Sequence, residues 1–147
     1  MFETMLVREW MTTPVYTITP KTPIAEAHKI MKDKKIRRLP VLHQGNVVGI
    51  VTLGDVREAS PSDATTLNIW ELNYLWSQLT VEKIMTTTVL TLEPDQPILD
   101  AAEVMFKHKV SGLPVIENKA LVGIVTESDI FRMLIRARHP TENTSAS

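Results

Sequence analysis

The sequence contains no cysteine among its 147 residues. This absence excludes disulfide bonds, thiolate metal ligands and cysteine nucleophiles together. No stretch approaches the roughly 20 consecutive apolar residues that a membrane-spanning helix needs. The first residues also lack the basic segment and apolar run that are typical of a signal peptide. We therefore expect a cytoplasmic protein with no membrane partner.

The sequence also has almost no net charge, because 16 Lys and Arg residues are balanced by 17 Asp and Glu residues. Such a balance gives no general attraction for nucleic acid, so any phosphate site must be local. The four histidines are scattered and have no metal-ligand spacing with nearby carboxylates. No phosphate-binding P-loop, Ser-His-Asp pattern or paired-carboxylate motif is visible. These absences argue against an enzyme, a metalloprotein and a nucleic-acid-binding protein.

What the sequence does contain is an internal repeat. Residues 7–59 (the first copy) align without a gap with residues 81–133 (the second copy), and about two in five aligned positions are identical. A repeat of this kind predicts two copies of one small structural unit. Each copy has too small a core to be comfortable alone. We therefore expect the copies to pack their sheet faces together around a pseudo-twofold axis.

Each copy is predicted to follow the order β-α-β-β-α. In the first copy, residues 15–18 read as a short strand, and Thr22-Pro23 reads as a helix start with a hydroxyl cap. Residues 39–42 and 47–51 read as two strands around a turn, and a second helix follows Thr52. The predicted fold class is α/β (α+β), with two pseudo-symmetric units and a linker helix between them.

The predicted organisation has four parts: residues 1–60 as the first unit, 61–80 as the linker, 81–138 as the second unit and 139–147 as a flexible tail. In the linker, residues 68–71 have capping-box spacing before an apolar run. The helix predicted there is apolar around most of its circumference, which favours burial on more than one side. Two alternatives stay open: the helix packs against its own units, or it also contributes to a homodimer contact.

The segments that carry chemistry are residues 49–55 and 123–129, where the last strand of each copy runs into a helix. Unpaired N–H groups at such a helix start suit a phosphate. The threonine hydroxyl can serve a phosphate, and the aspartate one turn later can accept hydrogen bonds from two ribose hydroxyls. The same Thr-x-x-Asp spacing is close to a capping box, so a purely structural role stays open.

This Gly-hydrophobic-x-Thr-x-x-Asp pattern is preceded in each copy by Leu-Pro-Val and, near the start of the copy, by Met-Thr. Together these motifs resemble those of the CBS (cystathionine β-synthase) domain, over about 106 residues in two copies. The resemblance implies a stand-alone tandem CBS pair that binds a regulatory adenosyl ligand and requires no cofactor. It favours AMP, ADP or ATP, with S-adenosylmethionine as another candidate ligand.

The resemblance also implies a set of site residues. It assigns the ribose to Asp55 and Asp129, the phosphates to Thr52, Thr126, Arg37 and Arg38, and the adenine pockets to Thr17, Ile18, Ile36, Pro40, Thr91, Leu92, Val110 and Pro114. Arginine suits phosphate because its planar fork makes paired, charge-assisted hydrogen bonds. The second copy has Ser111 and Gly112 in place of the arginine pair. Our hypothesis is that Arg37 and Arg38 clamp the ligand phosphate; the alternative is a solvated basic face.

Two functions follow from this interpretation. In the first, an adenine nucleotide occupies one or both clefts between the units and acts as an energy-sensing signal to a homodimer or to an unknown protein target. In the second, the chain is a nucleotide-independent dimerisation or protein-interaction module, and the Thr-Asp pairs only cap helices. An enzyme is not expected, because the repeat occupies almost the whole chain.

Overall fold

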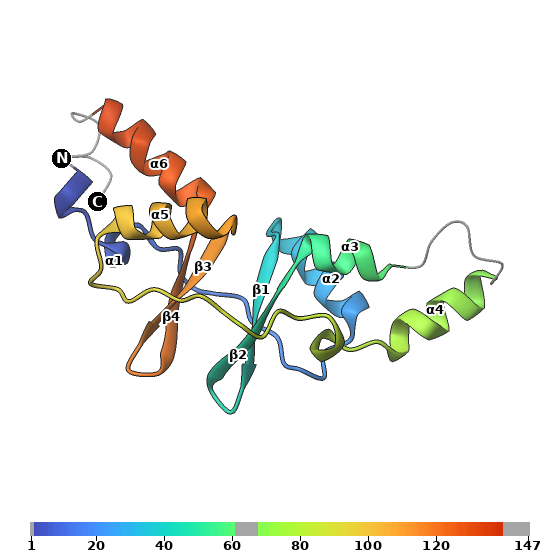
Figure 1. The fold of residues 1–147 in the computed structure, drawn as a ribbon. Coiled ribbons are helices and arrows are strands. Elements are labelled where there is room, and N and C mark those ends of the chain that lie inside the picture. The colour runs from blue at the N-terminus through green and yellow to red at the C-terminus, as the bar shows by residue number, and fades with distance from the viewer. Residues whose placement is uncertain (1, 61–67, 140–147) are drawn as a thin grey trace. The chain divides into compact units, whose positions relative to one another are not determined.

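The structure is a computed structural model that describes residues 2–60 and 68–139 (Figure 1). In chain order the elements are η1 (Phe2–Thr4), α1 (Val7–Trp10), α2 (Ile24–Lys34), β1 (Arg38–His43), β2 (Asn46–Thr52), α3 (Leu53–Ala59), α4 (Ile69–Gln78), η2 (Val81–Lys83), α5 (Ile98–His108), β3 (Gly112–Glu117), β4 (Ala120–Thr126) and α6 (Glu127–Arg138). No helix in the described ranges is long and apolar enough to cross a membrane.

The structure contains two small antiparallel sheets, with β1 paired to β2 in one and β3 paired to β4 in the other. The two hairpins have the same register, and each has one register irregularity at the equivalent place, after Val41 and after Val115. Helices accompany both sheets. The predicted fold class, two equivalent α/β units with a linker helix, is therefore confirmed.

The strand predicted over residues 15–18 is shorter than expected. Only Ile18 pairs with β1, as a single parallel bridge to Val41. The chain then leaves the sheet because the Thr19 amide donates to the Thr22 hydroxyl, at 3.0 Å, and Pro20 has no amide hydrogen to donate. The second copy has the same single bridge, from Leu92 to Val115.

The same turn changes the start of α2. The predicted hydroxyl cap is wrong, since the residue before the helix is Pro23 and no side chain caps it. The hydroxyl of Thr22 is engaged with Thr19 instead. The first free amide of the helix, on Ile24, is satisfied by the carbonyl oxygen of Leu79 at 2.9 Å. The start of this helix is thus fixed by the linker rather than by its own sequence.

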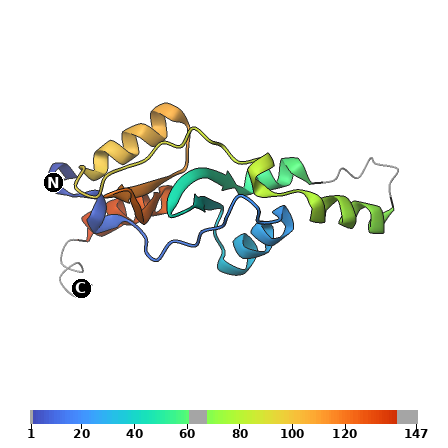
Figure 2. The same cartoon turned by 90° about the horizontal axis from the view of Figure 1, so that it is seen from below.

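The chain forms two compact units whose boundaries cut across the repeat. The Asp55 unit comprises Tyr16–Val89, and the Asp129 unit comprises Met1–Val15 together with Leu90–Ser147. The opening segment of each copy therefore belongs with the hairpin of the other copy. Two reciprocal backbone hydrogen bonds join Thr12 to Ile124, and another two join Thr86 to Ile50. As a result α1 lies beside β4, more than a hundred residues away in sequence (Figures 1 and 2).

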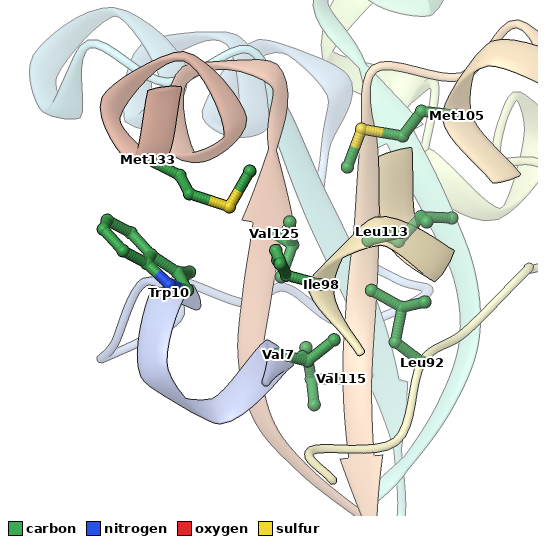
Figure 3. Close-up of a cluster of buried hydrophobic side chains, with 10 residues drawn as sticks. Val7, Trp10, Leu92, Ile98, Met105, Leu113, Val115, Val125 and Met133 are labelled. Atoms are coloured by element: carbon green, nitrogen blue, oxygen red, sulfur yellow. The ribbon is translucent and has the colours of Figure 1, made fainter. Parts of the chain in front are cut away.

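Each unit has its own apolar core. Figure 3 shows the core of the Asp129 unit, where Trp10 of α1 lies near Met133 of α6, and Ile98 of α5 lies near Val125 of β4. Side chains of this size contribute roughly 1.5–3 kcal/mol each when fully buried. The opening segments supply equivalent core residues, since Val7 and Val81 are both completely buried. Their burial explains why these segments are held by the hairpins.

Helix α4 forms in the linker as predicted. The side chain of Asn68 accepts a hydrogen bond from the Glu71 amide at 2.9 Å and so caps the helix start. The expected burial by the helix's own chain is not found, because no residue of α4 is buried and Trp70 is 80% exposed. Among the residues of α4, only Trp76 packs against the core of the Asp55 unit. The homodimer contact of this helix stays a prediction.

Candidate ligand-binding sites at the strand–helix junctions

The junction between β2 and α3 is closed by a reciprocal helix cap. The Thr52 amide donates to Oδ2 of Asp55 at 2.9 Å, and the Asp55 amide donates to the Thr52 hydroxyl oxygen at 3.1 Å. The capping role considered for this pair is therefore real. It uses only one acceptor position of the Asp55 carboxylate, and Oδ1 has no hydrogen-bond partner among the described residues. Capping and ligand binding are compatible at this junction.

The basic segment lies directly beside this junction. The amide of Leu53, the first residue of α3, donates to the carbonyl oxygen of Arg37 at 2.7 Å. Arg38 is the cross-strand partner of Thr52 in the β1–β2 register. The structure therefore brings the predicted phosphate residues Thr52, Arg37 and Arg38 together with the predicted ribose residue Asp55. Arg37 is exposed and Arg38 is half-buried.

The residues predicted for the first adenine pocket differ in their exposure to solvent. Ile36 is half-buried and precedes the arginine pair, and Thr17 is exposed. Ile18 is buried in the core of the Asp55 unit, and Pro40 is buried beside it, accepting a hydrogen bond from the Ile18 amide at 3.1 Å. Ile18 and Pro40 thus lie in the interior of the Asp55 unit. Contact of this group with a base stays a prediction.

The equivalent junction between β4 and α6 has the same backbone and a different hydrogen-bond network. The Thr126 amide donates to Oδ2 of Asp129 at 2.8 Å. The Thr126 hydroxyl also lies 3.4 Å from this oxygen. The other oxygen, Oδ1, accepts from the Thr12 hydroxyl at 2.9 Å and from the Arg132 guanidinium at 3.0 Å. Asp129 is only 4% exposed.

Around this second junction the basic pair is missing. The amide of Glu127 donates to the Ser111 carbonyl oxygen at 3.1 Å, in the manner of Leu53 and Arg37. Val110, predicted for the second adenine pocket, lines a groove between α5 and α6, and its contact with a base stays a prediction. Large apolar side chains line much of the rest of the groove: Met105, Phe106, Ile130 and Phe131. Of the other residues predicted for this pocket, Thr91 is exposed, whereas Leu92 and Pro114 are buried.

Sequence reasoning missed two members of the second network, Thr12 and Arg132. Thr12 belongs to the Met-Thr motif, but nothing in the local sequence shows that this motif reaches the other copy. Arg132 replaces Glu58 of the first copy, and this charge reversal near the aspartate was the available signal. No cluster of histidine and acidic residues in the described part of the chain can hold a metal ion.

The structure thus consists of two hairpin-centred units, each with a Thr-x-x-Asp junction where the second strand of its hairpin meets a helix. The family model for the CBS domain matches residues 7–62 and 81–136. The chain therefore belongs to the CBS domain family, as the motifs predicted. Members of this family include proteins of very different length, which the relatives of this chain illustrate.

A CBS domain-containing protein of Dictyostelium discoideum is 34% identical over 138 residues, which are 92% of this chain and 95% of that protein. A homoserine O-acetyltransferase of Methanococcoides burtonii is 37% identical over 130 residues, which are 87% of this chain and 24% of the enzyme. The chain likewise spans only 23% of an L-aspartate semialdehyde sulfurtransferase of Methanocaldococcus jannaschii. The enzyme names thus belong to much longer proteins.

Solved structures agree with this assignment. The CBS domain pair of protein MJ0100, in complex with 5′-methylthioadenosine and S-adenosyl-L-methionine, is 34% identical and has a TM-score of 0.73, covering 88% of this chain and 94% of that one. Protein MJ1225 from Methanocaldococcus jannaschii, described as a candidate archaeal homologue of γ-AMPK, is 27% identical with a TM-score of 0.78. It covers 90% of this chain, and this chain covers 48% of it.

Proposed function

We propose that the chain is a regulatory, non-enzymatic module that binds an adenosyl ligand, with AMP, ADP or ATP as the first candidates, and passes its occupancy to a homodimer or a partner protein. The observation that carries the proposal is the β2–α3 junction. Here the Asp55 carboxylate keeps open acceptor positions next to Thr52, Arg37 and Arg38. An open carboxylate suits the ribose hydroxyls, and adjacent guanidinium groups suit phosphate.

The comparisons support the ligand class rather than the particular ligand. One structural relative was solved with methylthioadenosine and S-adenosylmethionine, which share the adenosine group and carry no phosphate. The arginine pair favours a phosphorylated ligand for this chain. S-adenosylmethionine and methylthioadenosine are therefore the informative competitors of AMP, ADP and ATP.

Thermal unfolding with each of these five ligands tests the proposal. A ligand present at about 100 times its dissociation constant stabilises the folded state by about 2.7 kcal/mol, which raises Tm by several degrees in a protein of this size. Asp55→Asn keeps an oxygen that can cap α3 but weakens its bond to the ribose by about 1.5–3 kcal/mol. The shift should then fall strongly at the same ligand concentration. Asp33→Asn, at an exposed position on α2 of the same unit, is the matched control.

The phosphate clamp is tested separately. Arg38→Ala is expected to weaken ATP and AMP binding much more than adenosine binding, because only the phosphorylated ligands meet the guanidinium. Lys32→Ala, which removes an exposed positive charge from α2, is the control for net charge. Equal losses for ATP, AMP and adenosine would contradict the clamp. No Tm shift with any of the five ligands would contradict the nucleotide-sensing function itself.

One observation favours the alternative of an interaction module. Helix α4 exposes Ile69, Trp70 and Tyr74, whose side chains are 65–80% accessible. Aromatic residues of this kind are enriched at protein interfaces. Sedimentation of the wild type and of Trp70→Ser, with and without ATP, separates the two functions. A dimer that Trp70→Ser abolishes and that ATP leaves unchanged would favour the interaction module.

A further inference from the structure

The two repeat aspartates occupy equivalent positions but differ in what they bind. We propose that Arg132 and Thr12 close Asp129 to ligand, so that Asp55 is the ribose acceptor of this chain and Asp129 is a positioning residue. This inference rests on the proposed function for its statement about ribose. Its statement about Asp129 rests on the hydrogen-bond network alone.

The count of acceptor positions separates the two carboxylates. An ionised carboxylate offers about four lone-pair positions for hydrogen bonds. At Asp129, three donors lie at 2.8–3.0 Å: the Thr126 amide on Oδ2, and Thr12 and Arg132 on Oδ1. The Thr126 hydroxyl is 3.4 Å from Oδ2, longer than the usual O–H···O distance of roughly 2.5–3.0 Å. At Asp55 the only donor among the described residues is the Thr52 amide. The two ribose hydroxyls can therefore both add bonds at Asp55, whereas at Asp129 they must displace at least one of the donors already present.

Arg132 is held at Asp129 by more than the ion pair. Its guanidinium also donates to the carbonyl oxygen of Trp10 at 2.9 Å and lies over the indole ring, 5.6 Å from the ring centroid. Trp10 is 8% exposed and forms part of the core of the Asp129 unit. Swinging Arg132 away from the carboxylate would therefore break three contacts together. Although the Arg132 side chain is 49% exposed, its guanidinium is therefore held in place by the buried Trp10 as well as by Asp129.

In the first copy, the counterparts of Arg132 and Thr12 do not donate to Asp55. Glu58 stands where the second copy has Arg132, and a carboxylate cannot donate to Asp55. Trp10, which contacts Arg132 in the Asp129 unit, is replaced by Ile84 at the equivalent position of the Asp55 unit. Thr86, the counterpart of Thr12, makes no hydrogen bond to Asp55. The closure is thus a property of the second copy, and it coincides with the loss of the arginine pair at Ser111 and Gly112.

The network also gives Asp129 a different role. It joins α6 to the opening segment of the chain, because Thr12 follows α1 and Arg132 bonds to the last residue of α1. The carboxylate is buried and charged, so its donors are needed to compensate its lost hydration. Substituting it should destabilise the Asp129 unit, whereas substituting Asp55 should chiefly affect ligand binding.

Isothermal titration of the full chain with AMP and with methylthioadenosine tests the ribose part. We expect one equivalent of bound ligand per chain, a loss of at least about tenfold in affinity for Asp55→Asn, which corresponds to about 1.4 kcal/mol, and a change below about twofold for Arg132→Ala. Arg136→Ala is the matched control, because Arg136 also lies over Trp10, at 5.4 Å, and makes no hydrogen bond to Asp129. Two equivalents per chain, one of them lost in Asp129→Asn, would overturn the inference.

A thermal double-mutant cycle tests the closure without any ligand. Arg132→Ala should lower Tm by about 3 °C or more in the wild type. The fall should be smaller in Asp129→Asn, because the ion pair is already weakened there, while the contacts of Arg132 with Trp10 are lost in both backgrounds. Additive Tm changes would overturn the closure. Should Asp129→Asn fail to fold, Thr12→Val replaces it in the cycle, since it removes the second donor to the same oxygen. If AMP and methylthioadenosine do not bind the wild type, the proposed function fails, and the cycle still decides the role of Asp129.

Discussion

Gly123→Ala tests how the opening Met-Thr segment is seated on the β3–β4 hairpin. A Cβ atom placed on Gly123 would lie 2.5 Å from Sδ of Met11 and 2.8 Å from its Cγ. Contacts this short require the methionine or the strand to move, and overpacking of this kind typically costs about 1–3 kcal/mol. We expect Tm to fall by roughly 3–8 °C in consequence.

Thermal and urea unfolding followed by circular dichroism measure this effect. Gly54→Ala is the matched control, because the nearest atom to its added Cβ is 3.6 Å away and Gly54 lies within α3. Replacing a helical glycine by alanine stabilises by roughly 0.5–1 kcal/mol. Met11→Ala should remove part of the penalty of Gly123→Ala by opening the space. An unchanged stability of Gly123→Ala would refute the packing of Met11 over this strand.

Three further predictions concern the same architecture. Arg8 donates to Asp95 at 2.9 Å, so Arg8→Glu should lower the stability of the Asp129 unit, and adding Asp95→Lys should restore part of it; equal Tm values for the single and double variants would contradict this. The hydrogen bond from Lys21 lowers the pKa of Glu82 below its ordinary value of 4.5, so this contribution to stability is present above that pH and is lost as the pH falls through the lowered pKa. Unfolding of Glu82→Gln should lack that part of the acid dependence, and identical pH profiles would contradict it. Asn68→Ala removes the cap of α4 and should lower helix content by circular dichroism, at a cost of roughly 0.5–2 kcal/mol to that helix.

The repeat allowed much of the fold to be predicted from the sequence. Identical residues at equivalent positions, such as Gly49 and Gly123, predicted where the hairpins lie. Asn68 predicted the start of the linker helix. The hydroxyl cap at Thr22 was predicted wrongly, since the same hydroxyl can instead accept from Thr19 in a preceding turn. Local patterns do not distinguish these two uses because both satisfy the same side chain.

The exchange of opening segments was beyond the local pattern. Val7 and Val81 are both buried in the structure, and the sequence pattern around them does not show which hairpin buries them. The charges of the opening segments do indicate the correct hairpin, but this is recognised only once the ion pairs are known from the structure. Arg8 pairs with Asp95, and the equivalent positions of the other unit carry the reversed pair, Glu82 with Lys21. A segment seated on its own copy would bring like charges together, which disfavours the alternative arrangement.

The candidate site was predictable in part for a related reason. Thr-x-x-Asp indicates both a cap and a ligand site, and at the first junction the structure is compatible with both. At the second junction the same motif contains a buried carboxylate, and Thr12 and Arg132 donate hydrogen bonds to it. A motif specifies the backbone at its own position, whereas the surrounding segments determine which acceptors stay open.

A crystal structure of the protein grown with AMP would test the assignment of the ribose to Asp55 most directly. We expect one ligand per chain, with both ribose hydroxyls at hydrogen-bond distance, about 2.7 Å, from the Asp55 carboxylate, and with the Arg132–Asp129 pair intact. A ligand whose ribose is bound to Asp129, with Arg132 displaced, would contradict the assignment of the two aspartates. AMP at saturating concentration with neither junction occupied would contradict nucleotide binding by this chain.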